Sequence, residues 1–290
     1  MCLIMKRIKI NLLVLFNNLL IKSGFLNLFP KIPTHEDKTA YAFWRMQSVK
    51  DEISIMSKLG INITDKVVLD FGCGEGGKLL ELYKLNPKKL YGVDINEDEL
   101  QYARSLIFNK IGGKINVEIK KCNHNTIPIP DSSIDIIICI SVLEHVSDIN
   151  SVAKEWFRIL KDNGKVFIKF QPFESPYGHH AIRILGIPWC HCFLSSDELK
   201  LLVDKVRLQH KKITNKDLLP NLPYINRLKL NDIISVILNN GFKLEHYFLI
   251  KLMGKTHKWS NYIARLLFIF PTFRPYFSSV LISVLRKNLN

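Results

Sequence analysis

Apolar residues recur with two different periods along the middle of the chain. Short apolar runs predict strands at 66–71, 89–94, 115–120, 134–140 and 165–170. Apolar residues at helical spacing predict helices between them, at 78–85, 97–109 and 152–160. The run 134–140 has hardly any polar position, which is typical of a central parallel strand covered on both faces. Such alternation predicts an α/β fold with a Rossmann-like, doubly wound and mostly parallel sheet.

The alternation lapses after residue 170 and then resumes. Residues 171–227 are rich in proline and carry one clear helical segment, 195–206. A helix at 230–239 and strands at 242–250 and 278–285 bring the predicted sheet to seven strands, with an apolar helical stretch at 261–270. We expect four parts: N-terminal helices capping the core over 1–60, the Rossmann-like core over 61–170, a lid or substrate insertion over 171–227 before the sixth strand, and the C-terminal part of the core sheet over 228–290.

The two ends of the chain have apolar segments that allow two interpretations. Residues 8–28 are rich in Leu, Ile and Phe but are interrupted by asparagines and Lys22, whereas a spanning helix needs about 20 nearly uninterrupted apolar residues. We favour an amphipathic helix that caps the core, followed by a second helix at 40–59; the alternative is peripheral contact with a membrane surface. For 259–285 we favour completion of the sheet over a membrane-surface helix.

Lys and Arg outnumber Asp and Glu by 41 to 26, a formal net charge of +15. This excess could attract nucleic acid, anionic lipid or a phosphorylated substrate. Because the lysines form no run longer than two, we favour a charge spread over solvated faces, and no nucleic-acid module is recognisable. The six cysteines do not suggest a disulfide framework, which favours a reducing cytoplasm.

A glycine-rich turn follows the first strand of the core. Gly72, Gly74 and Gly77 satisfy the G-x-G-x-x-G pattern of a dinucleotide site. Asp94 ends the next strand, 20 residues after Gly74, where an acidic side chain would bind ribose hydroxyls. In a parallel sheet the ligand lies at the carboxyl ends of the strands, so these residues predict a nucleotide-type cofactor there.

Charge separates the two cofactors that this geometry allows. Asp70 and Glu75 flank the turn, and two carboxylates would repel the pyrophosphate of a nicotinamide dinucleotide. S-adenosyl-L-methionine carries a sulfonium and an ammonium in place of phosphates, so the same carboxylates suit it. We favour the methyl donor, with a nicotinamide cofactor as the alternative.

Five motifs in order carry a resemblance to a known family; they lie at 68–76, 91–95, 127–135, 141–146 and 160–165. They resemble the motifs of class I S-adenosylmethionine-dependent methyltransferases, in the small-molecule branch that contains ubiquinone and sterol methyltransferases (methyltransferase type 11). The resemblance covers roughly residues 65–170. It implies a Rossmann-like fold, S-adenosyl-L-methionine as the cofactor, and methyl transfer as the activity.

The resemblance also implies roles for residues near the first two strands. Asp70, Gly72 and Gly74, with Cys73 between the glycines, would hold the methionine end of the cofactor. Asp94 would accept hydrogen bonds from the ribose hydroxyls.

Four further residues would complete the cofactor site by the same resemblance. Ile95 would pack on the adenine, and Ser141 would lie near the sulfonium. Asn123 and His124 stand where the family usually has an Asp that meets the adenine amino group. An asparagine can still accept from that amine, so binding remains compatible with this departure.

Four histidines are candidate general bases, since imidazole exchanges protons near neutral pH. His145 follows the fourth strand, and His179, His180 and His191 lie in the insertion. Each could instead have a structural role, which we favour for His145. The Cys190-His191-Cys192 spacing is not that of a structural zinc site, so no metal is expected.

The sequence therefore predicts an S-adenosylmethionine-dependent methyltransferase acting on a small-molecule, lipid or glycan acceptor. Nucleic acid is not an expected partner, because Ser141-Val142-Leu143-Glu144 stands in place of an Asn/Asp-Pro-Pro-aromatic signature. The alternatives are a nicotinamide-dependent oxidoreductase and a catalytically silent binding module at a membrane. The predicted location is cytoplasmic, with possible peripheral membrane contact through the N-terminal helix.

Overall fold

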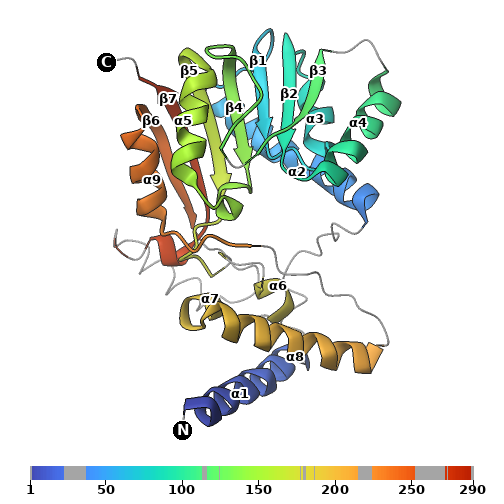
Figure 1. Cartoon of the computed structure of the whole chain (residues 1–290), viewed down its shortest axis with the longest axis vertical. Helices are drawn as coiled ribbons and strands as arrows, with labels where there is room; N and C mark the ends of the chain where they lie inside the picture. Colours follow the sequence, from blue (N-terminus) through green and yellow to red (C-terminus); the bar gives the residue numbers. More distant parts are fainter. Residues whose placement is uncertain are drawn as a thin grey trace. The chain divides into compact units, whose positions relative to one another are not determined.

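The computed structural model (Figure 1) describes residues 2–22, 37–112, 116–123, 125–176, 178, 181–185, 187–214, 224–251, 272 and 274–288. The chain divides into two compact units, a helical unit and a sheet unit. The helical unit consists of residues 1–31, 171–230 and 249–280. The sheet unit consists of residues 32–170, 231–248 and 281–290.

Seven strands form one sheet in the order β3-β2-β1-β4-β5-β7-β6. Their bounds are β1 Val67–Phe71, β2 Lys89–Asp94, β3 Val117–Lys121, β4 Ile134–Ile140, β5 Leu160–Phe170, β6 Phe242–Lys251 and β7 Ser278–Lys287. The pairs from β3 through β5 are parallel, and β7 pairs antiparallel with β5. The predicted seven-stranded, mostly parallel sheet is confirmed. The antiparallel β7 between β5 and β6 distinguishes it from a six-stranded dinucleotide-binding sheet, whose order is 3-2-1-4-5-6.

Helices connect the parallel strands: α3 Gly77–Tyr83, α4 Glu97–Ile111 and α5 Ile149–Ile159. Helix α2, Lys38–Lys58, precedes the sheet and packs on α3; α9, Leu230–Asn239, precedes β6. The chain winds from β1 toward β3 in one direction and from β4 toward β5 in the other. Right-handed crossovers therefore put α3 and α4 on one face of the sheet and α5 on the opposite face.

The core of the sheet unit is built from the central strands and α5. Trp156 of α5 is fully buried and meets Phe71 of β1 edge-on, with ring centroids 5.3 Å apart. Leu69, Ile137 and Phe167 from β1, β4 and β5 are also fully buried. Burial on both faces explains the apolar run of β4 and fixes the strand ends that carry the site.

The helical unit has its own hydrophobic cluster. The described α-helices of this unit are α1 Cys2–Lys22, α6 Ile182–Leu185, α7 Cys190–Phe193 and α8 Ser196–Thr214. Ile10 and Val14 of α1 share this cluster with Leu202 and Val206 of α8. Among the described helices, none is long and apolar enough to cross a membrane.

The two N-terminal helices, which we expected to cap the core together, fall in different units. Helix α2 belongs to the sheet unit, whereas α1 groups with residues 171–230, because its apolar positions are matched by those of α8. The predicted helical stretch at 261–270 lies outside the described residues.

Candidate active site at the carboxyl ends of the strands

Strand register brings the predicted cofactor residues to one edge of the sheet. Phe71 of β1 pairs with Val93 of β2 on one side and with Cys139 of β4 on the other. Asp94, the last residue of β2, and Gly72, which follows β1, therefore lie at neighbouring strand ends. Because the chain reverses its winding between β1 and β4, this edge is also the topological switch point, where α/β sheets bind their ligands.

The glycine turn is held open by backbone conformations that only glycine adopts easily. Gly72 and Gly74 have φ angles of +74° and +52°. The backbone N–H groups of Gly72 and Cys73 both donate to the carbonyl of Val93, at 2.9 and 3.0 Å. The turn is thereby fixed against the end of β2, with half-buried glycines that a ligand can approach.

Asp94 joins the two loops that would enclose a ribose. Its Oδ2 accepts the backbone N–H of Gly74 at 3.0 Å, and its Oδ1 accepts that of Asn96 at 3.0 Å. Each carboxylate oxygen keeps a further lone pair for a hydroxyl. Asn96 in turn caps α4, whose first turn carries Glu97, Asp98 and Glu99. The arrangement fits a ligand with two neighbouring hydroxyl groups.

The end of β4 approaches the glycine turn closely. A Cβ on Gly72 would overlap Cγ2 of Val142 and lie 3.0 Å from its Cγ1. Ser141, just before, is exposed and has φ +57°, in the left-handed region, while its N–H donates to Lys169 at 2.7 Å. A non-glycine residue held in this conformation is a mark of functional sites, so Ser141 remains a candidate contact.

A buried lysine lies beneath the glycine turn, and the sequence interpretation did not include it. The Nζ atom of Lys78 lies 2.8 Å from Oδ1 of Asp70 and donates to the carbonyl of Gly72 at 3.0 Å. Both charged side chains are at most 2% exposed. Burial raises the pKa of the Asp70 carboxyl, and the nearby Lys78 ammonium opposes that rise.

This ion pair corrects the charge argument made from the sequence. Asp70 is already paired, so it does not add a free negative charge to the turn. A sequence signal existed: Lys78 is followed by Leu79, Leu80 and Leu82 in a short apolar segment, and a lysine that becomes buried with such a segment needs an anion.

The remaining predicted cofactor residues differ in exposure. Ile95 is 51% exposed and Asn123 is exposed at the end of β3, so both can be reached by a ligand. Cys73 is buried, and burial raises the pKa of its thiol well above the usual value, so Cys73 contributes to the turn through its backbone. His124 lies outside the described residues.

The candidate bases fall in different units. His145 lies in the sheet unit, in the 3-10 turn Leu143–His145 directly after β4, and is half-buried. His191 lies in the helical unit and is 1% exposed; its Nε2 donates to the carbonyl of Phe173 at 2.6 Å. Burial lowers the pKa of His191. His179 and His180 lie outside the described residues. The role of general base stays a prediction for all four histidines.

Helix α2 adds a cation that the sequence interpretation also missed. A Cβ on Gly77 would lie 2.9 Å from the carbonyl carbon of Ala42, which places α2 directly against the start of α3. Arg45, one turn further along α2, is half-buried, and its positive charge opposes the rise that burial causes in the pKa of Asp70. Arg45 is therefore a candidate cation for the site.

Comparison with known proteins identifies the fold and the domain. Residues 69–168 match the family model of a methyltransferase domain. A ubiquinone biosynthesis O-methyltransferase of Pseudomonas fluorescens (strain Pf0-1) is 33% identical over 109 residues, which are 37% of this chain and 45% of that protein. One from Pseudomonas putida (strain W619) is 30% identical over 137 residues, 44% of this chain and 57% of that protein. The chain thus spans about half the length of the curated relatives it matches.

Solved structures share the fold at low sequence identity. An S-adenosylmethionine-dependent methyltransferase from Mesorhizobium loti has a TM-score of 0.53 and 14% identity, covering 81% of this chain and 97% of that one. The [4+2]-cyclase SpnF has a TM-score of 0.54 and 12% identity, covering 84% of this chain and 83% of that one. Residues 69–168 are therefore similar in sequence to a methyltransferase domain, and the chain shares the fold of solved S-adenosylmethionine-dependent methyltransferases.

Proposed function

We propose that the protein transfers a methyl group from S-adenosyl-L-methionine to a small-molecule, lipid or glycan acceptor. The observation that carries the proposal is Asp94, whose carboxylate is fixed by the N–H groups of Gly74 and Asn96 at the end of β2. This cradle suits a ribose, and the methyltransferase domain match supports the cofactor. A cyclase with the same fold shows why the reaction needs its own test.

The chain's residues would hold the cofactor at both ends. Asp94 would bind the ribose hydroxyls, Ile95 and Asn123 would contact the adenine, and the backbone of the glycine turn would receive the methionine end. That end carries a carboxylate, for which Arg45 is the candidate counterion, since a guanidinium binds carboxylates with two parallel hydrogen bonds.

S-adenosyl-L-methionine supplies an activated methyl group on a sulfonium. The protein's part is to align the acceptor with that group and exclude water, since orientation alone accounts for much of such a rate. The relatives named for an O-methylation step favour a hydroxyl acceptor. A hydroxyl must lose its proton as the oxygen–carbon bond forms, and His145, three residues after the β4 turn at Val142, is the candidate base in the sheet unit.

The cofactor assignment is tested by thermal denaturation with S-adenosylhomocysteine. A ligand that binds only the folded state raises the melting temperature. We expect a rise for the wild type, no rise for Asp94→Ala, and a smaller rise for Arg45→Met. Asp51→Ala, which removes an exposed carboxylate of α2, is the matched control and should keep the full rise.

Two other outcomes would redirect the assignment. Stabilisation by a nicotinamide dinucleotide but not by S-adenosylhomocysteine would establish the oxidoreductase alternative. Binding of S-adenosylhomocysteine without transfer of labelled methyl to any phenolic, lipid or glycan acceptor would favour a silent or different-reaction module.

A further inference from the structure

Helix α1 presents a wide apolar face to solvent. Five large apolar side chains, 48–62% exposed, lie on that face: Ile8, Leu12, Leu15, Phe16 and Leu19. Their spacing of three and four residues puts them on one side of the helix over three turns. A surface helix ordinarily exposes its polar side, and large exposed apolar patches mark interaction sites.

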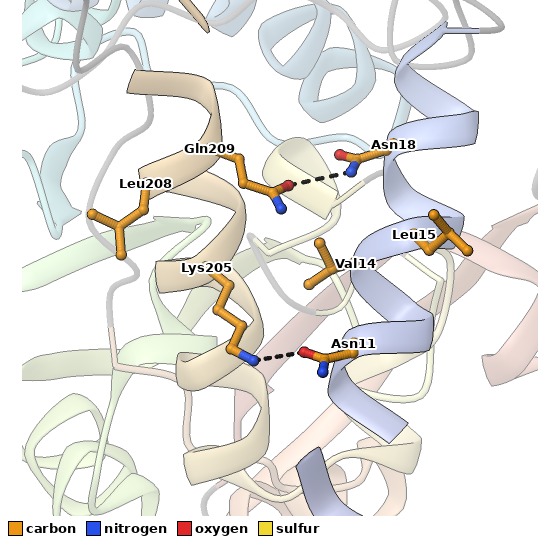
Figure 2. A pocket seen from close by; sticks show the side chains of 7 residues that line it. All are labelled: Asn11, Val14, Leu15, Asn18, Lys205, Leu208 and Gln209. Carbon is orange, nitrogen blue, oxygen red and sulfur yellow. Dashed lines mark hydrogen bonds between the residues drawn. The ribbon is translucent and has the colours of Figure 1, made fainter. Parts of the chain in front are cut away.

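Three polar side chains of α1, those of Lys9, Asn11 and Asn18, contact α8 instead. Lys205 donates to Asn11 at 2.8 Å, and Asn18 donates to Gln209 at 3.2 Å; both bonds cross the groove between the helices in Figure 2. Lys9 pairs with Glu198 of α8 at 3.3 Å. The polar groups of α1 thus fix its orientation on α8, and this orientation leaves the apolar face outward.

Nearly all of the protein's excess charge belongs to the same unit. The helical unit has 19 Lys and Arg against 5 Asp and Glu, whereas the sheet unit has 22 against 21. Helix α1 itself has no acidic residue. The charge is therefore unevenly divided between the units, unlike the even spread favoured from the sequence.

We infer that α1 docks the protein on a bilayer that contains anionic phospholipid. An apolar helix face can enter the boundary between headgroups and acyl chains, and a basic unit is attracted by the surface charge. A second copy would bring two strongly positive units together, which like-charge repulsion opposes. A nucleic acid would match the charge but not the apolar face. The inference concerns residues other than those of the cofactor site and does not depend on methyl transfer.

Co-sedimentation of the full chain with vesicles tests the inference, without cofactor. We expect binding to phosphatidylcholine vesicles that contain phosphatidylglycerol, weaker binding to phosphatidylcholine alone, and weakening by salt. The double variant Leu12→Gln/Leu15→Gln should bind about tenfold or more weakly, because it removes two leucines that the bilayer would bury on binding. Phe108→Gln removes a 65% exposed aromatic from α4 of the sheet unit and should bind like the wild type.

Circular dichroism and the melting temperature check that both variants remain folded. Equal binding by the double variant and the wild type would overturn the inference, as would the absence of binding to anionic vesicles. A concentration-dependent dimer that the double variant loses, without vesicle binding, would assign the face to a second copy instead. Weak response to S-adenosylhomocysteine would leave this result unchanged, so the two proposals fail independently.

Discussion

The ammonium of Lys78 and the carboxylate of Asp70 form an almost fully buried ion pair beneath the glycine turn, 2.8 Å apart. The same ammonium donates to the carbonyl of Gly72. The pair therefore links the end of β1, the turn and the start of α3. Breaking a buried pair by removing one partner leaves an uncompensated charge, so this contact has a measurable effect on the site.

Lys78→Met should lower the free energy of unfolding by about 3–5 kcal/mol, because Asp70 is left buried without its counterion. The double variant Lys78→Met/Asp70→Asn should recover part of this loss, since the charge is removed as well. Urea unfolding curves of the three proteins measure both effects. A single variant within about 1 kcal/mol of the wild type would show that the pair is not needed.

Gly72→Ala should destabilise the protein by about 1–3 kcal/mol, because its Cβ meets Val142 at a positive φ. Gly60→Ala is the matched control: Gly60 has φ +70° but open space around the added Cβ. It should cost only the backbone strain, about 1 kcal/mol. Thermal or urea unfolding compares the two, and Gly72→Ala/Val142→Ala should recover the steric part. Equal losses at both glycines would show that the contact with Val142 is unimportant.

Asp148 caps α5, and protonation of its carboxylate should contribute to the pH dependence of stability. Its carboxylate accepts the N–H of Ser151 at 3.0 Å and its hydroxyl at 2.6 Å, and these hydrogen bonds lower the pKa of Asp148. A carboxyl with a lowered folded pKa stabilises the protein above its ordinary pKa near 4 and loses this effect as the pH falls through the folded value.

At pH 7, Asp148→Ala should cost about 1 kcal/mol, whereas Asp148→Asn retains a side-chain oxygen for the cap. Chemical denaturation at a series of pH values should show a shallower acid loss for Asp148→Asn than for the wild type. If Asp148→Asn and the wild type lost stability equally as the pH falls, Asp148 would not contribute to the acid sensitivity.

His191 should destabilise the folded state in mild acid. Burial lowers its pKa, so the unfolded chain takes up a proton near pH 6.5 that the folded chain does not. Stability should therefore fall as the pH drops below about 6.5. His191→Gln, which can still donate to Phe173, should show a flatter profile between about pH 6.5 and 5. A profile as steep as that of the wild type would contradict this assignment.

The sheet unit was predictable because its signals are local. Strand β4 was predicted at its observed bounds, 134–140. The signal is the apolar run itself, which needs no knowledge of residues distant in sequence. The start of α5 was predicted at Val152 but lies at Ile149, since the capping carboxylate of Asp148 adds a turn that apolar spacing does not reveal.

The missed features depend on partners distant in sequence. The contact of α1 with α8 joins segments nearly 190 residues apart, as Lys9 and Glu198 show. The division of charge between units likewise appears only when residues are sorted by the contacts of the fold. Periodicity describes one segment at a time and cannot identify such a partner.

The two hydrogen bonds from Gly74 and Asn96 to Asp94 have a consequence for the energetics of ligand capture. Both loops are already ordered around the carboxylate, so a ligand would not lose affinity to the entropy of ordering them. The favourable contacts with the ligand would then contribute to its affinity almost in full, even for a fragment of the cofactor. Adenosine has the ribose and adenine but no methionine end. Adenosine alone should therefore bind measurably to the cofactor site of the protein.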